Sequence, residues 1–139
     1  MRARILMFPL FATVLAAGCA ASDRPKIALG TPCVACSMEI ADLRFASGRR
    51  VAGKWRAYDA IECLIRDTGT TAGEPPWLPD YDTRILHPAD SMWVVKGEFP
   101  SPMSGGFAAF SNRAGADQVA AETRGAVDRF AAWAAKGWP

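Results

Sequence analysis

The residues best suited to chemistry are Cys33, Cys36 and Met38, in the stretch "CVACSM". Thiolate and thioether sulfurs are soft donors, and among the common biological ions they favour Cu(I). In an extended segment, residues two apart face the same side, so Cys36 and Met38 would point at one ion. Because a turn can bring Cys33 close as well, the spacing predicts a Cu(I) site built from these three sulfurs.

Other uses of the cysteine pair stay open. The C-x-x-C spacing occurs in thioredoxin-like oxidoreductases, in which the first thiolate lies at a helix N-terminus after a strand. Here Pro32 precedes the motif and no βαβ unit leads into it. Exported proteins also form structural disulfides, in this case between Cys33 and Cys36. Zinc usually takes four Cys or His ligands, and Cys63 and His87 are the only further candidates.

Three other sulfur-containing residues bear on the site. Met103 lies in the Pro- and Gly-rich stretch "PSPMSGGF", where no hydrophobic period requires a methionine, so it is a candidate additional ligand. Met92 lies in the strand-like "SMWVV" and is expected in the core. Cys63 lies beside an apolar run and is interpreted as a small buried hydrophobic residue.

The sequence offers little that could support catalysis. It contains a single histidine, which leaves no basis for a Ser-His-Asp set. No Gly-rich loop with phosphate-binding spacing follows a strand and opens a helix. Glu39, Asp42 and Asp59 are isolated carboxylates, interpreted as solvated or helix-capping. We therefore expect a protein that is not an enzyme.

The N-terminus has the features of a bacterial lipoprotein signal peptide. Arg2 and Arg4 precede an apolar run over 5–17 that is too short to span a bilayer. The run ends in "LAAGC", whose Cys19 would receive the lipid. The alternatives are an ordinary secretory signal cut near Ala17 and an uncleaved anchor.

This reasoning predicts a signal peptide over 1–18 and a lipidated tether over 19–32. The protein would then face the periplasm, anchored by lipid to the cell envelope; the outer membrane is favoured because Ala20, not Asp, follows Cys19. Without the two signal-peptide arginines the 16 basic residues become 14, equal to the 14 acidic residues, so no basic footprint for nucleic acid remains. Three cysteines are left, and an odd number does not suit a disulfide framework.

Hydrophobic patterns along the chain predict an α+β fold with small antiparallel sheets. The expected elements are a hairpin over 40–58 with its turn at Ser47-Gly48, a helix over 59–67, a loop over 68–80, strands within 83–88, 91–97 and 106–112, a helix over 113–125, and a strand passing into a helix over 126–138. The order strand, strand, helix, strand occurs twice in this series. It divides the chain into a first ββαβ half over 33–86, which carries the motif, and a second over 87–139.

Several of these segments together resemble the NosL family, copper-binding lipoproteins that assist the maturation of nitrous-oxide reductase. The resemblance rests on "LAAGC" at 15–19, "CVACSM" at 33–38, "DLRFAS" at 42–47, "WRAYDAIECL" at 55–64 and "SPMSGGFAAF" at 101–110. These segments follow the family's order and span nearly all of the chain after the signal peptide.

The resemblance implies two ββαβ halves related to part of the organomercurial lyase MerB. It also implies a metallochaperone that holds Cu(I) in the periplasm and passes it to the partners that build the copper–sulfide centre of the reductase. By position, Cys36 and Met38 would be the main ligands, Cys33 would assist and Met103 would close the site. The alternative function is an envelope thiol–disulfide oxidoreductase that uses Cys33 and Cys36, and a MerB-like carbon–mercury lyase is a third.

Two positions depart from the family pattern. Ser37 stands where the family has glycine between the second Cys and the Met, and Ser104 replaces the glycine after Met103. If position 37 needs a positive φ, serine is strained there. These departures leave the client open, so a related copper enzyme such as an oxidase is also a possible partner.

Overall fold

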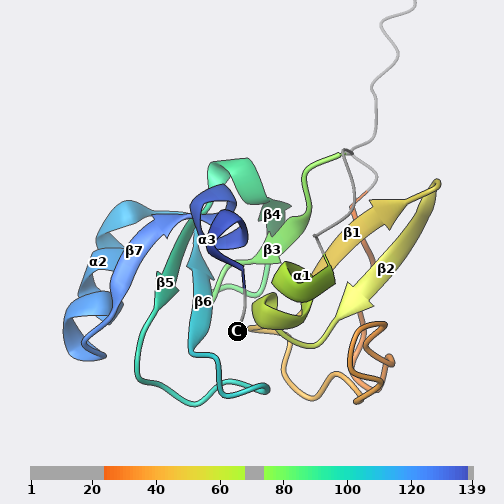
Figure 1. Cartoon of the computed structure of the whole chain (residues 1–139), viewed down its shortest axis with the longest axis horizontal. Coiled ribbons are helices and arrows are strands. Elements are labelled where there is room, and N and C mark those ends of the chain that lie inside the picture. Colours follow the sequence, from red (N-terminus) through yellow and green to blue (C-terminus); the bar gives the residue numbers. More distant parts are fainter. Residues whose placement is uncertain (1–23, 68–73, 138–139) are drawn as a thin grey trace, which may run out of the picture.

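Residues 24–67 and 74–137 are described by the computed structural model, and they fold into two antiparallel sheets and three α-helices (Figure 1). This confirms the predicted α+β class. The predicted signal peptide, Cys19 and the start of the predicted tether lie outside the described residues. Within the described ranges, no helix combines the length and apolar character needed to cross a membrane.

The two sheets share one feature of strand order. The first sheet has the order β2-β1-β3-β4, and the second has the order β6-β5-β7. In each sheet, the strand that comes first in the sequence lies in the middle of three: β1 between β2 and β3, and β5 between β6 and β7. The strands are β1 (Ser47–Val51), β2 (Lys54–Tyr58), β3 (Trp77–Pro79), β4 (Leu86–Pro88), β5 (Trp93–Lys96), β6 (Phe107–Phe110) and β7 (Ala126–Arg129).

The helices are α1 (Ile61–Asp67), α2 (Arg113–Glu122) and α3 (Phe130–Lys136), with a short 3-10 helix, η2 (Ala89–Ser91). All three α-helices were predicted, although α1 starts two residues later than expected and α2 ends before Gly125. Helix α1 contacts β1 and β2 of the first sheet and β6 of the second. It therefore lies between the sheets, and its first five residues are all buried.

The predicted hairpin turn at Ser47-Gly48 is wrong. Both residues belong to β1, and the turn lies at Ala52 and Gly53, whose φ angles are 48° and 76°. Two left-handed residues in succession suit a tight hairpin turn. Gly48 is explained by packing and not by a turn. A Cβ at this position would lie 3.0 Å from the ring of Pro25, because the N-terminal segment packs directly over the strand.

The predicted loop over 68–80 is also wrong at its C-terminal end, where β3 forms. Its central residue, Leu78, is fully buried, and the strand pairs with β1 on one side and β4 on the other. A strand this short is stabilised by its two neighbours and by burial rather than by its own propensity. Residues 68–73 of the predicted loop lie outside the described residues.

Candidate metal centre

The motif forms a closed loop over residues 33–38. The N–H of Cys33 donates to the carbonyl oxygen of Met38 at 2.8 Å, and the carbonyl oxygen of Cys33 accepts from the N–H of Ser37 at 2.9 Å. Ser37 has a φ of 66°, in the left-handed region that favours glycine. Cys33 therefore uses both of its backbone groups to close the loop, and Cys36 lies near the loop's tip.

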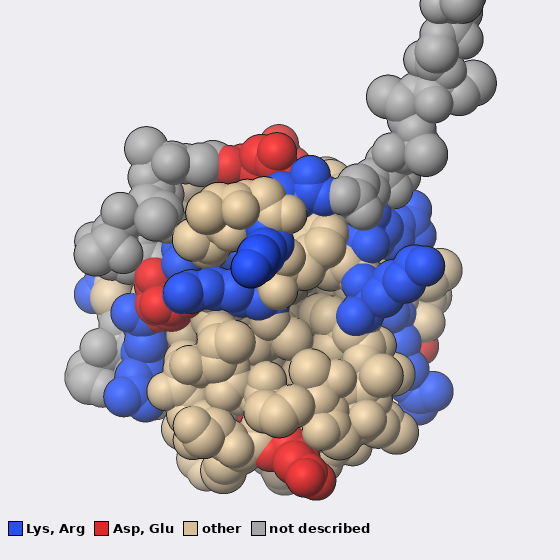
Figure 2. Space-filling model, turned by 90° about the vertical axis from the view of Figure 1, so that its right-hand side faces the viewer, with Lys and Arg blue, Asp and Glu red and all other residues tan. Residues whose placement is uncertain are grey.

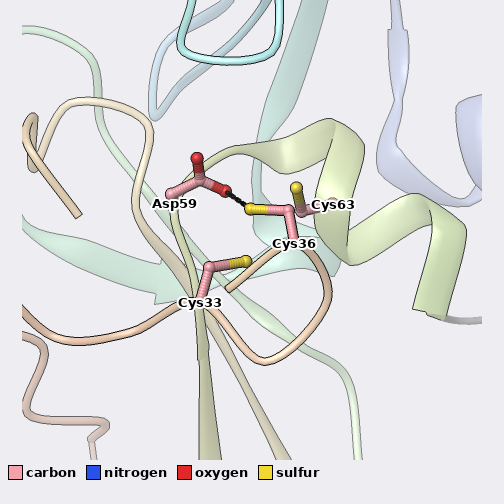
Figure 3. Close-up of side chains that lie close together, drawn as sticks. All are labelled: Cys33, Cys36, Asp59 and Cys63. Atoms are coloured by element: carbon pink, nitrogen blue, oxygen red, sulfur yellow. Dashed lines mark hydrogen bonds between the residues drawn. The ribbon is translucent and has the colours of Figure 1, made fainter. Parts of the chain in front are cut away.

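This loop is attached to the strand that leads into α1. The N–H of Val34 donates to the carbonyl oxygen of Ala57 in β2 at 3.1 Å. Directly after β2 comes Asp59, and Cys63 follows in the first turn of α1. The attachment brings the two motif cysteines next to Asp59 and Cys63, and Figure 3 shows the four side chains converging.

One donor atom from each of the four residues lies within 4.8 Å of the others. Cys33, Asp59 and Cys63 are buried, with 2%, 2% and 0% of their surface exposed. Cys36 alone is half-buried. The centre is thus closed on the side of the core and accessible through Cys36.

The carboxylate of Asp59 is incompletely satisfied. Its Oδ1 accepts a hydrogen bond from the thiol of Cys36 at 3.4 Å, whereas its buried Oδ2 has no partner among the described residues. Burying a polar oxygen without a partner costs free energy. A cation held among the thiols would supply that partner, so the donor set fits a metal ion.

Burial raises the pKa of the Cys36 thiol, and a hydrogen bond from the backbone N–H of Met38 to its sulfur opposes this shift. Burial also raises the pKa of Cys63, and the neighbouring Asp59 carboxylate adds to this rise. Both thiols therefore carry their protons at neutral pH. A metal ion that binds them must displace these protons, which couples binding to pH.

The arrangement of Cys36 and Met38 in the structure differs from the predicted one. The expectation of an extended segment with Cys36 and Met38 in phase is wrong, because the loop is closed. Met38 instead lies opposite Cys33, beside the antiparallel bridge between Pro32 and Glu39, and opposed residues of an antiparallel pair share a face. Its side chain is 45% exposed. Met38 thus lies at the solvent side of the loop, and its ligand role stays a prediction.

The other predicted donors are more distant in sequence. Met103 is half-buried and packs against the same hydrophobic cluster as Cys36. Its ligand role also stays a prediction. His87 lies in β4, opposite Leu78, and does not belong to the group of four found among the described residues. A zinc site of three cysteines and His87 is therefore not what the fold assembles.

The sequence interpretation considered Cys63 only as a zinc ligand or a core residue and did not consider Asp59 as a ligand. Cys63 is buried as expected, but its sulfur faces the motif cysteines. Asp59 is neither solvated nor isolated. The predicted helix over 59–67 would have placed residues 59 and 63 on one face, because they are four apart.

In comparisons with known proteins, no protein-family model and no curated protein matches the chain.

Proposed function

We propose that the protein binds Cu(I) at the centre formed by Cys33, Cys36 and Cys63 and passes the ion to a partner protein. The observation that carries the proposal is the convergence of three cysteine sulfurs within 4.8 Å of one another. Thiolates select Cu(I) because both are soft, and Cu(I) accepts low coordination numbers. Met38 and Met103 are proposed as additional thioether ligands.

The unequal burial of the three cysteines supports transfer rather than permanent storage. Cys33 and Cys63 are buried, whereas Cys36 is partly open to solvent. An incoming sulfur ligand can approach the ion on the side of Cys36 while the two buried thiolates still hold it. Ligand exchange of this kind moves copper without releasing it into solution, and it requires no bond-breaking chemistry on a substrate.

The surface around the loop suits a protein partner. Figure 2 shows the face that carries the β1–β2 hairpin: basic side chains, in blue, lie mainly over its upper part, and the lower part is largely uncharged apart from an acidic group at its lower edge. The segment around the motif exposes Leu29 (62%), Val34 (51%) and Met38 (45%). Exposed apolar groups beside a metal site favour docking of a partner over the centre.

The proposed setting is the periplasmic side of the cell envelope, with lipidated Cys19 as the anchor and the outer membrane favoured. The proposed class is the NosL family, and the proposed partners are nitrous-oxide reductase or a related cuproenzyme and its assembly factors. The order of the elements supports this class, because β1-β2-α1-β3 and β5-β6-α2-β7 each run strand, strand, helix, strand. In the proposal they are the two ββαβ halves of a metallochaperone.

Asp59 favours a second candidate, a zinc-binding protein. Three cysteine sulfurs and one carboxylate oxygen supply the four donors that a tetrahedral Zn²⁺ site takes. The thiol–disulfide oxidoreductase has less support. Such enzymes place the first thiolate of the pair at an accessible helix N-terminus, whereas Cys33 is buried and begins the closed loop over 33–38.

The test is a Cu(I) titration of the purified, reduced protein against a competing chelator, with and without excess Zn²⁺. Tight Cu(I) binding that Zn²⁺ does not displace, and its loss in Cys36→Ser, are expected. Met92→Leu is the matched control, since it removes a sulfur that is fully buried in the hydrophobic core. Binding of Zn²⁺ in preference to Cu(I) would establish the second candidate, and rapid disulfide reductase turnover without metal binding would establish the oxidoreductase.

A further inference from the structure

Glu62 is a buried carboxyl group next to the metal centre but outside it. It lies in α1 between Ile61 and Cys63, and its side chain is fully buried. A buried carboxyl group is costly, and burial raises its pKa. Hydrogen bonds to the Glu62 carboxyl group are therefore needed to offset the cost of its burial.

These hydrogen bonds come from the loop that carries Met103. Oε1 of Glu62 accepts a hydrogen bond from the hydroxyl of Ser101 at 2.8 Å and another from the N–H of Gly105 at 2.9 Å. The same Ser101 hydroxyl accepts from the N–H of Gly106 at 2.9 Å. One oxygen atom therefore binds the loop on both sides of Met103.

The loop is shaped around this carboxyl group. A Cβ at Gly105 would lie 2.2 Å from Cγ of Glu62, so only glycine allows the approach. Ser104 has a φ of 57°, and its N–H donates to the carbonyl oxygen of Ser101 at 3.0 Å. The turn over residues 101–104 is thus closed by the backbone hydrogen bond between Ser104 and Ser101, and the hydrogen bond from Ser101 to Glu62 fixes it to α1.

We infer that Glu62 is a positioning residue that holds the Met103 loop against the metal centre. The inference rests on the proposed function. Helix α1 would present Cys63 to the ion directly and, through Glu62, fix the loop that carries Met103. Met103 packs against the same hydrophobic cluster as Cys36, and that cluster contains Cys33 and Cys63.

The experiment compares two substitutions of Glu62 for Cu(I) affinity. Glu62→Gln keeps an oxygen that accepts both hydrogen bonds, so it should bind Cu(I) as the unsubstituted protein does. Glu62→Leu is of similar size but has no acceptor, and Cu(I) binding should weaken roughly tenfold, as for loss of a group that orients a metal ligand. Asp80→Asn, which alters a buried carboxylate outside the group of four, controls for general destabilisation.

A double-mutant cycle shows whether the effect passes through Met103. In a Met103→Leu background, Glu62→Leu should cause little further loss of affinity. Hydrogen exchange at the N–H groups of Gly105 and Gly106, measured without metal, should accelerate in Glu62→Leu but not in Glu62→Gln. Ser101→Ala removes only the hydroxyl link and gives the same test if Glu62→Leu does not fold.

An equal loss of Cu(I) affinity in the presence and absence of Met103 would overturn the inference, because Glu62 would then act on the cysteines instead. Unchanged exchange at Gly105 and Gly106 in Glu62→Leu would overturn the anchoring itself. If the unsubstituted protein does not bind Cu(I), the proposed function fails and the role of Glu62 in metal binding fails with it; the exchange measurement separates that outcome from a failure of the anchor alone.

Discussion

Cys63, in the first turn of α1, and Cys36, in the motif loop, place their sulfur atoms within 4.8 Å of each other. The C-x-x-C motif therefore supplies only two of the three converging sulfurs. Because the third comes from a helix, the complete centre exists only in the folded protein, and metal binding should stabilise the fold.

The first prediction concerns Cys63 as a metal ligand. Cys63→Ala should weaken Cu(I) binding by at least roughly tenfold, or about 1.4 kcal/mol, because a buried thiolate donor is lost. Competition with a Cu(I) chelator measures the change, and Met92→Leu, which alters a fully buried core residue, should show none. An unaltered affinity in Cys63→Ala would mean that Cys63 only packs in the core.

The second prediction compares Met38, a proposed metal ligand, with Met92, a core residue. Met38→Leu should lower Cu(I) affinity several-fold and leave the melting temperature almost unchanged, because the Met38 side chain is 45% exposed. Met92 is fully buried in the hydrophobic core, so Met92→Leu should cost less than about 1.5 kcal/mol of stability and leave Cu(I) affinity unchanged. Equal Cu(I) affinities in the two variants would remove Met38 from the ligand set.

The third prediction concerns backbone strain in the motif loop. Ser37 has a φ of 66°, which glycine adopts without the steric penalty that a side chain incurs. Ser37→Gly should therefore raise the free energy of unfolding by about 0.5–1 kcal/mol, measured by urea denaturation. Ser91, which is not among the positive-φ residues, is the control: Ser91→Gly should lower stability, and a gain there would point to a cause other than φ.

The fourth prediction is an acid-sensitive contribution to stability from Asp80. Burial opposes ionisation of Asp80, but hydrogen bonds from Ser111 and Thr83 outweigh it and lower the pKa to about 2. Since this folded-state pKa lies below the ordinary value of 3.8, ionised Asp80 stabilises the fold above that pH, and the contribution is lost as the pH falls towards 2.

Asp80→Asn should therefore cost about 2 kcal/mol at pH 7 and progressively less below pH ~4, followed by thermal unfolding across a pH series. Asp82→Asn is the matched control, since Asp82 lies in the same loop with an exposed side chain. A cost in Asp80→Asn that stays constant from pH 7 to pH ~2 would show that the carboxylate charge is not responsible.

Part of this structure follows from the sequence alone. The α+β class, helices α1 and α2, and the strand-to-helix passage at the C-terminus depend on local hydrophobic periods and helix-forming residues, which act over a few neighbouring positions. The positive φ considered for Ser37 is present in the structure, at 66°, and Ser104 has a φ of 57°. The motif cysteines were identifiable because they lie close together in the chain.

Tertiary structure decided the rest, because the decisive contacts join residues distant in sequence. Gly48 signals a turn locally, but it lies inside β1, where it pairs with Ala57 and Trp77 and where its lack of a Cβ leaves room for Pro25. Cys63 and Asp59 have the sequence context of a buried hydrophobic residue and a helix cap. They meet the motif cysteines in the folded protein, where the Val34–Ala57 hydrogen bond attaches the motif loop beside the start of α1. The sequence by itself determined which donors the protein has; the packing of the loop, the hairpin and α1 decided which of them meet.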